Sequence, residues 1–218
     1  MTVGAGAHYC KRNLRQHSLN GCIDKGFQDL IANKTKLEGV FLIENNVLED
    51  DRGFFLENYK ASVLNKRLRE PHRFAQSNHS RSQANTLRGF RKEPWNKLIY
   101  VVHGTALCVV VDTRPDSETF GQSETFLMGD SPGKRNRLYV PTGVSNAFYC
   151  LTAVDYFNDV SGEFEPSGRF GFRWNDPDVA VEWPCEDPVL SDTDKAQPFL
   201  RDLFPEHPFF EEATNTVS

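Results

Sequence analysis

The sequence predicts an all-β protein, an antiparallel sandwich or barrel of the jelly-roll type. Short apolar runs of strand length recur along residues 39–157, and many are rich in β-branched or aromatic residues. Gly, Pro, Asn and Asp separate these runs, and no long amphipathic helical segment lies between them. Many short strands at this spacing are typical of sandwiches and barrels, and the mouth of such a barrel is a natural ligand site.

The expected strands follow one another in seven runs. KLIYVV, LCVVV and NAFYCL are too short for buried helices and carry the residue types that favour strands. Cys108 and Cys150 lie within such runs, and we expect both to be core residues. In chain order the runs are GVFLIEN (39–45), RGFFLENY (52–59), KLIYVVHG (97–104), TALCVVVDTR (105–114), TFLMGD (125–130), RLYVPTG (137–143) and NAFYCLTAVDYF (146–157).

Length and composition indicate one compact domain with short additions at both ends. The chain has 218 residues, of which 39% are apolar and 12% aromatic, so it can bury a substantial core. We expect an N-terminal extension over residues 1–36, the β domain over residues 37–200 and a C-terminal tail over residues 201–218. The stretch over residues 26–40 could hold a short helix before the first strand.

Charge and missing motifs exclude several classes of protein. The formal charge of −5 is spread along the chain, so nothing indicates a nucleic-acid binder. No stretch approaches the roughly 20 apolar residues that cross a bilayer, and the N-terminus lacks the apolar centre of a secretory signal, so we expect a cytoplasmic protein. The five cysteines form no CxxC pair and the histidines no HxH pair, so we expect reduced thiols and no metal.

Polar residues interrupt the strand pattern between residues 76 and 97. Gln76, Asn78 and Ser80 share one face of a strand because side chains alternate with a period of two. If that face is the interior, a ligand would satisfy these groups, and Arg88 and Lys97 would add positive charge to a concave wall. The alternative is an internal salt-bridge network that holds the same cations. Its carboxylates would be Glu44, Glu57 and Asp112.

A specific set of motifs runs in order from about Leu37 to Pro198. They are QSNHSRS…TLRGF, KLIYVVHGTALCVVVDTRPDSETFG, RLYVPTGV…AF, FRWNDPDVAVEWP and LSDTD. Together they resemble the dTDP-4-dehydrorhamnose 3,5-epimerase family of the cupin superfamily. The resemblance implies a homodimeric jelly roll that takes no metal and no cofactor. It also implies proton abstraction at C3 and C5 of a 4-keto-6-deoxy sugar nucleotide, with the ketone as electron sink.

The resemblance assigns roles to individual residues. Arg88 and Lys97 match cations near the pyrophosphate and the sugar C4 oxygen, where positive charge stabilises a developing enolate. Asp194 matches the carboxylate that orients the family's catalytic histidine. The residues implied to contact the nucleotide and its phosphates are Arg52, Phe55, Glu57, Gln76 and Asn78.

The sequence departs from the family pattern at three places. Arg91 stands where the family's LRGLH motif has the histidine base, and a guanidinium keeps its proton and cannot act as a base. We therefore expect Arg91 to form an ion pair with Asp194. Asn146 replaces a second histidine and can still donate a hydrogen bond to a phosphate. No tyrosine follows Tyr156 to act as the family's acid, and Phe164 cannot donate a proton.

Other groups are candidates to replace the lost base. If the strand bulges at Gly89, Lys92 or Glu93 could approach the sugar. His103 would share a face with Lys97 on an unbroken strand, but the turn predicted at VVHGT places His103 at the rim.

Three functions stay open on the sequence. The first is altered isomerase chemistry on a nucleotide-linked keto-deoxysugar, which the lineage favours. The second is a catalytically silent nucleotide-sugar-binding protein. The third is a re-purposed enzyme in which Arg88, Arg91 and Lys97 bind a different anionic substrate. The loss of both acid and base argues against ordinary 3,5-epimerisation.

Overall fold

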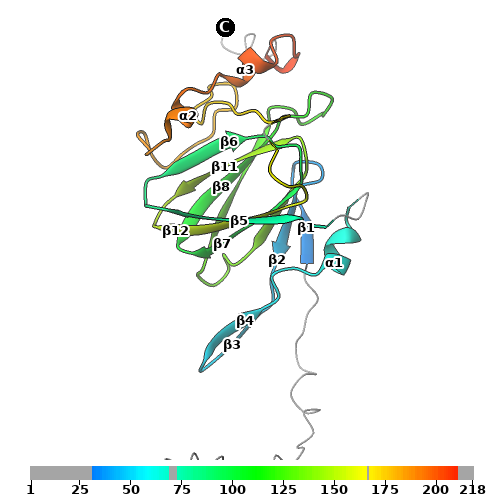
Figure 1. The fold of residues 1–218 in the computed structure, drawn as a ribbon, viewed down its shortest axis with the longest axis vertical. Coiled ribbons are helices and arrows are strands. Elements are labelled where there is room, and N and C mark those ends of the chain that lie inside the picture. Colours follow the sequence, from blue (N-terminus) through cyan, green and yellow to red (C-terminus); the bar gives the residue numbers. More distant parts are fainter. Residues whose placement is uncertain (1–30, 69–72, 166, 211–218) are drawn as a thin grey trace, which may run out of the picture.

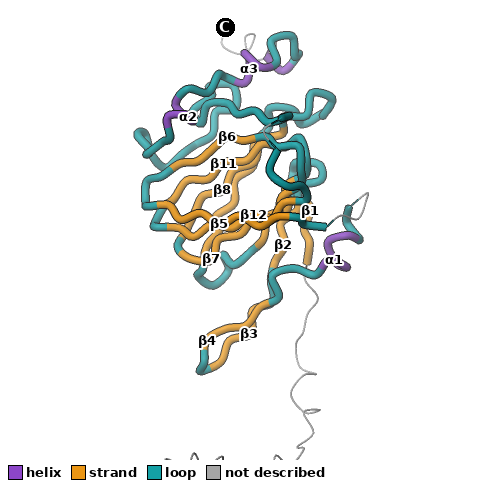
Figure 2. Tube along the Cα trace, in the orientation of Figure 1, coloured by secondary structure: helices purple, strands orange, loops and turns teal. Residues whose placement is uncertain are grey.

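The computed structural model describes residues 31–68, 73–165 and 167–210. Its strands form two antiparallel sheets that face each other, so the predicted all-β jelly roll is confirmed (Figures 1 and 2). The larger sheet contains, in spatial order, β1 (Ile31–Lys34), β2 (Phe41–Glu44), β10 (Arg137–Val140), β7 (Lys97–His103), β12 (Val154–Val160) and β5 (Gln76–Ser82). The smaller sheet contains β6 (Leu87–Arg91), β11 (Val144–Cys150), β8 (Thr105–Asp112) and β9 (Ser123–Gly129).

The remaining elements lie outside the two sheets. A separate hairpin extends away from the barrel, at the end opposite the C-terminal helices (Figure 1). The three described helices are only four or five residues long, and none has the length needed to span a membrane. The hairpin strands are β3 (Val47–Asp50) and β4 (Gly53–Leu56), and the helices are α1 (Ala61–Asn65), α2 (Asp192–Lys195) and α3 (Leu200–Leu203).

The main core lies between the two sheets and follows from the alternation of side chains along the strands. In β8, Cys108 and Val110 point inward and pack in one cluster with Ile99 of β7 and Phe148 of β11. Cys150 belongs to the same cluster, so both cysteines are core residues as predicted. The inner faces are therefore apolar over most of their length, which confines polar side chains to one open end.

The C-terminal segment covers the outer face of the smaller sheet. Val109 and Val111 of β8 face outward and pack with Leu200 of α3 and with Phe210, which is 8% exposed. The expected tail boundary at residue 200 thus falls inside α3. This covering segment holds α2 against the edge of β6 (Figure 1).

Residues 31–34 form a strand where the sequence suggested a short helix. β1 pairs with β2 along its whole length, from Ile31 opposite Glu44 to Lys34 opposite Phe41. Ala32 is buried in an apolar cluster on the outer face of the larger sheet. Pairing with a sheet edge overrides the local helix propensity here, and the rest of the expected helix before residue 31 lies outside the described residues.

Candidate active site

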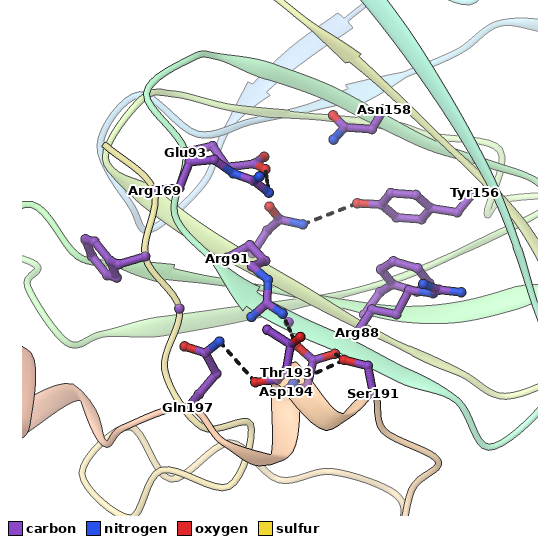
Figure 3. A pocket seen from close by; sticks show the side chains of 15 residues that line it. Arg88, Arg91, Glu93, Tyr156, Asn158, Arg169, Ser191, Thr193, Asp194 and Gln197 are labelled. Carbon is purple, nitrogen blue, oxygen red and sulfur yellow. Dashed lines mark hydrogen bonds and ion pairs between the residues drawn. The ribbon is translucent and has the colours of Figure 1, made fainter. Parts of the chain in front are cut away.

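A pocket of about 640 Å³ opens at the polar end of the barrel, where strands of both sheets and the C-terminal segment meet (Figure 3). Its wall is formed by β6, β11, β12 and the loops around α2. The lining residues are Arg88, Gly89, Arg91, Glu93, Asn146, Phe148, Tyr156, Asn158, Arg169, Phe170, Gly171, Ser191, Thr193, Asp194 and Gln197.

A bulge in β6 brings Arg88 and Arg91 to the same wall. The pairing with β11 shifts within the strand, so that three steps along β6 oppose two steps along β11. Residues three apart would otherwise point to opposite faces. Gly89 permits the bulge, because its φ is +122° and a Cβ there would lie 2.6 Å from the Cβ of Ala147. Glu93 also lines the pocket, as expected for a strand that bulges here.

Arg91 forms the expected ion pair with Asp194. Arg91 Nη2 contacts Asp194 Oδ1, and Arg91 Nη1 donates to the Phe90 carbonyl oxygen at 3.1 Å. Ser191 Oγ donates to Asp194 Oδ2 at 2.7 Å and accepts from the Asp194 backbone N–H at 3.1 Å, so the N-cap of α2 also fixes the carboxylate. Asp194 is 5% exposed; its Oδ2 accepts a hydrogen bond from Ser191, and its buried Oδ1 contacts the Arg91 guanidinium. Arg91, which the resemblance aligns with the family's base, is therefore a permanent cation held by a carboxylate.

A second group of charges surrounds Glu93. Arg169 Nη2 lies 2.7 Å from Glu93 Oε1, and Lys97 Nζ lies 3.0 Å from Glu93 Oε2. Lys97 Nζ also donates to Asn146 Oδ1 at 2.5 Å and to the Arg91 carbonyl oxygen at 3.3 Å. An ammonium has three hydrogens, and each has an acceptor here. Lys97 is 1% exposed and lies behind the pocket wall, not in it.

The protonation of this group follows from competing effects. Burial alone would raise the pKa of Glu93, but the adjacent cations Lys97 and Arg169 outweigh it and hold the pKa of the carboxyl below its usual value. Burial lowers the pKa of Lys97, and the attraction of Glu93 opposes that effect. Glu93 is therefore ionised at neutral pH and is a weak proton acceptor.

The phenol of Tyr156 lies in the pocket beside Asn146. Asn146 Nδ2 donates to Tyr156 Oη at 3.3 Å, and the Tyr156 ring stacks on Phe148 with centroids 4.0 Å apart. Burial raises the pKa of the Tyr156 phenol well above 10, so it keeps its proton. Phe164, in the segment where the family has its acid, is 60% exposed, and the Arg169 guanidinium lies 4.9 Å from its ring centroid.

The polar face predicted for β5 lies on the pocket side but at the edge of the sheet. Asn78 lies opposite Asn158, a pocket residue, and Ser80 lies opposite Tyr156. Gln76 Nε2 donates to Asn78 Oδ1 at 2.6 Å, and neither residue lines the pocket in this structure. Asn78 borders the pocket through its strand partner Asn158, whereas Gln76 lies opposite Val160, which does not line it.

The two histidines considered from the sequence face away from the pocket. His79 stacks on Phe157 with centroids 4.3 Å apart, and its Nε2 lies 2.9 Å from Asp155 Oδ1. A register shift near the end of β7 breaks the alternation that would have aligned His103 with Lys97. His103 lies at the rim as predicted.

Three residues that the resemblance placed at the nucleotide lie on or next to the hairpin. Arg52 pairs with Asp50 at 2.5 Å, and Glu57 pairs with Lys60 at 2.7 Å. Phe55 is 59% exposed on β4. The hairpin extends away from the barrel, and one chain does not bring these residues to the pocket (Figure 1).

The salt-bridge alternative was right in kind and wrong in its partners. Asp112 accepts from Arg114 Nη2 at 2.6 Å and stabilises its own loop, instead of pairing with the pocket cations. Of the two cations in that alternative, Lys97 pairs with Glu93, and Arg88 forms no ion pair with the described residues; Asp194 pairs with Arg91 and Glu93 also with Arg169. The sequence interpretation missed Arg169, which lies in a loop without a strand period to place it. Within the described ranges, no group of three metal-binding side chains lies together.

Fold and pocket together define a jelly-roll protein with a polar, cation-rich pocket at one end of the barrel. The sequence model of dTDP-4-dehydrorhamnose 3,5-epimerase matches residues 34–202. The enzyme of that name from Escherichia coli K12 is 35% identical over 156 residues, which are 69% of this chain and 83% of the relative. The chain therefore belongs to the dTDP-4-dehydrorhamnose 3,5-epimerase family.

Solved structures of two relatives match the same fold. A dTDP-6-deoxy-D-glucose-3,5-epimerase from Legionella pneumophila, in complex with dTDP-4-keto-L-rhamnose, aligns with a TM-score of 0.74 and 31% identity over 79% of this chain and 93% of the other. A double mutant of a 3′-monoepimerase from Streptomyces bikiniensis, with one His changed to Asn and one Tyr changed to Phe, is in complex with dTDP. It aligns with a TM-score of 0.73 and 26% identity over 84% of this chain and 96% of the other.

Proposed function

We propose that the chain binds a dTDP-linked sugar in this pocket and does not carry out the two-carbon epimerisation of its family. The observation that carries the proposal is the Arg91–Asp194 ion pair at the position of the missing base. A general base needs a free lone pair within about 3.2 Å of the proton that it removes. Asp194 is held by Arg91 and Ser191, and Glu93 is held by two cations.

The charges around the pocket support a diphosphate ligand. Four cations (Arg88, Arg91, Arg169 and Lys97) against two carboxylates leave an excess of two positive charges. A nucleoside diphosphate sugar carries two negative charges on its pyrophosphate. Arg88 Nε donates to Ser82 Oγ at 2.9 Å, and Arg88 forms no ion pair with the described residues. Its exposed guanidinium thus remains free for a phosphate.

Loss of the acid–base pair does not in itself remove binding. The Streptomyces bikiniensis mutant, which has a His-to-Asn and a Tyr-to-Phe change, still holds dTDP. The resemblance places Arg91 at the family's histidine, and no tyrosine follows Tyr156 in the stretch where it places the family's acid. By this analogy we expect the pocket of this chain to bind the nucleotide.

Two measurements test the proposal together. Calorimetry with dTDP should show binding, and NMR in D₂O should show no exchange of the C3 and C5 protons of dTDP-4-keto-6-deoxyglucose. The double variant Arg91→His/Phe164→Tyr should restore exchange at one or both carbons. Exchange in the unaltered protein would contradict the silent site, and absence of dTDP binding would contradict the whole proposal.

A second function, altered isomerase chemistry, is favoured by one observation. Glu93 and Tyr156 both line the pocket, one ionised and the other protonated, so a base and an acid are present. The low pKa of Glu93 makes it a weak base, which is why we rank this function second. Under this alternative the unaltered protein exchanges one proton, and Glu93→Gln abolishes the exchange.

The position of the hairpin supports a homodimer. Arg52 and Phe55 are far from the pocket of their own chain, and the hairpin exposes Leu48, Phe54 and Phe55. The hairpin contacts the barrel through Arg135, which pairs with Glu49 and lies 4.0 Å from the Phe54 ring centroid. A two-stranded hairpin that still exposes aromatic residues is typical of a segment that packs on a partner. We propose that a second copy of the chain receives the hairpin beside its pocket.

A further inference from the structure

The Tyr156 hydroxyl ends a chain of hydrogen bonds that begins at Lys97 behind the pocket wall. Tyr156 lies on β12, is 5% exposed and lines the pocket, and its phenol points toward the other lining side chains (Figure 3). Its ring stacks on Phe148 with an interplanar angle of 9°, so the hydroxyl oxygen has a fixed position. The direction of the hydrogen bond to Asn146 therefore decides where the phenol proton points.

Lys97 fixes the orientation of the Asn146 amide. Lys97 Nζ can only donate, and it lies 2.5 Å from Asn146 Oδ1. The oxygen and the nitrogen of an amide have nearly the same shape, and the hydrogen-bond partners decide which is which. Because the oxygen faces the ammonium, the amino group faces Tyr156 Oη, 3.3 Å away. An amide NH₂ can only donate, so the phenol oxygen accepts this bond.

The phenol proton is consequently directed away from Asn146. The buried phenol keeps this proton, because burial raises its pKa well above 10. Across the described ranges, Asn146 Nδ2 is the only hydrogen-bond partner of Tyr156 Oη, and it does not accept. A buried donor gains free energy when it finds an acceptor, and a ligand in the pocket can present one.

Resting on the proposed function, we propose that Tyr156 donates a hydrogen bond to the bound dTDP-sugar, and that Lys97 and Asn146 position its proton. The ligand presents an acceptor oxygen to the phenol, from either the diphosphate or the sugar. Tyr156 thus adds a neutral donor with a fixed direction to a pocket whose other ligand-facing donors are mostly cations.

Removal of the hydroxyl tests the contact with the ligand. Tyr156→Phe keeps the ring that stacks on Phe148 and should lower the affinity about tenfold in calorimetry, which corresponds to about 1.4 kcal/mol. A loss for both dTDP and dTDP-4-keto-6-deoxyglucose assigns the acceptor to the diphosphate, and a loss for the sugar ligand alone assigns it to the sugar. Tyr149→Phe is the matched control. Tyr149 Oη donates to Asn85 Oδ1 at 2.9 Å, away from the pocket, so both affinities should stay unchanged.

A second variant tests the direction of the proton. Asn146→Asp keeps the shape of the side chain but replaces the amino group by an acceptor oxygen, so the phenol should turn its proton toward this carboxylate. The added negative charge weakens binding of an anionic ligand by itself. The informative quantity is therefore the further effect of Tyr156→Phe in the Asn146→Asp background, which should fall from about tenfold to less than about twofold.

The outcomes separate this inference from the proposed function. If the unaltered protein binds dTDP and Tyr156→Phe binds both ligands equally tightly, the inference is overturned and the proposed function stands. An equal effect of Tyr156→Phe in both backgrounds would also overturn it, because Asn146 would not direct the proton. Should Asn146→Asp fail to fold, the Tyr156→Phe measurement alone decides. If the unaltered protein binds neither ligand, the inference and the proposed function both fall.

Discussion

Arg91 and Lys97 are both cations of the site, but they act in different ways. Arg91 lines the pocket and is half-buried, whereas Lys97 lies behind the wall and joins Glu93 and Asn146 from the inside. A buried ion pair gains Coulomb attraction and loses hydration, so its net contribution to the free energy of unfolding is small. Removal of one partner is still costly, because the other charge stays buried at low dielectric constant without a counter-charge. Lys97 is therefore a structural support of the pocket.

The first prediction concerns this support. Lys97→Met should lower the free energy of unfolding by about 3 kcal/mol, because Glu93 and Asn146 lose their buried partner. The added change Glu93→Gln should recover part of the loss. Urea unfolding measures both variants. Lys195→Met is the control, since Lys195 is exposed and should change stability by less than about 0.5 kcal/mol. Equal effects of the two lysine variants would contradict the structural role.

The sequence predicted one of the two ion pairs and not the other. Arg91 and Asp194 stand at motif positions whose contact the family resemblance implies, so a substitution at one position predicts the new pair. Arg169 and Glu93 are 76 positions apart, and Arg169 lies in a loop. No periodicity predicts where a loop side chain points, so this contact could be found only in three dimensions.

At the scale of the elements, register shifts decide which side chains reach the pocket. The extra residue in β6 brings Arg88 and Arg91 to one face, and the shift near the end of β7 carries His103 to the rim. A sequence pattern gives the period of a strand but not the position of a bulge, which depends on the neighbouring strand. The positions of the strands were therefore predictable, but the sheet face to which each side chain points was not.

The second prediction tests the β6 bulge. Gly89→Ala should lower the free energy of unfolding by about 3 kcal/mol, because the left-handed φ adds strain and the new Cβ meets Ala147. Gly133→Ala is the control, because Gly133 also has a positive φ but has no atom within 4 Å of an added Cβ. Gly133→Ala should lower the free energy of unfolding by about 1 kcal/mol. Urea unfolding separates strain from steric overlap, and similar losses would contradict the close packing at Gly89.

The third prediction concerns the loop over residues 112–121. Burial would raise the pKa of Asp112, but hydrogen bonds from Arg114, Ser117 and Thr119 outweigh it and hold the pKa below the usual value. Because the folded pKa is depressed, the stabilisation is present above about pH 4 and is lost as the pH falls through the folded pKa. Asp112→Asn should therefore cost about 2 kcal/mol at pH 7 and much less near pH 2.

Urea unfolding at several pH values measures this difference. Asp116→Asn, in the same loop but exposed, is the control and should leave the stability and its pH dependence unchanged. A cost for Asp112→Asn that stays constant with pH would show that the carboxylate charge does not stabilise the loop.

At the scale of the whole molecule, the residues that the resemblance assigns to the site lie in two distant regions. The barrel end carries Arg88 and the ion pairs, and the hairpin carries Arg52 and Phe55 (Figure 1). The sequence predicted the fold, because strand patterns are local properties, and the roles that the resemblance gives to both groups stay predictions. It could not predict that one chain leaves the groups apart, since the position of a hairpin depends on packing against its surroundings.

The fourth prediction tests whether a second copy unites the two regions. Arg88→Ala disables the pocket and Arg52→Ala disables the hairpin, so neither variant alone should bind dTDP tightly. When differently tagged chains are mixed, refolded together and purified as the hybrid dimer, one of the two pockets receives an unaltered hairpin and an unaltered Arg88. Calorimetry should then show the original affinity at half the original stoichiometry. If each chain used its own hairpin, the hybrid would contain two defective sites and would bind no better than the separate variants.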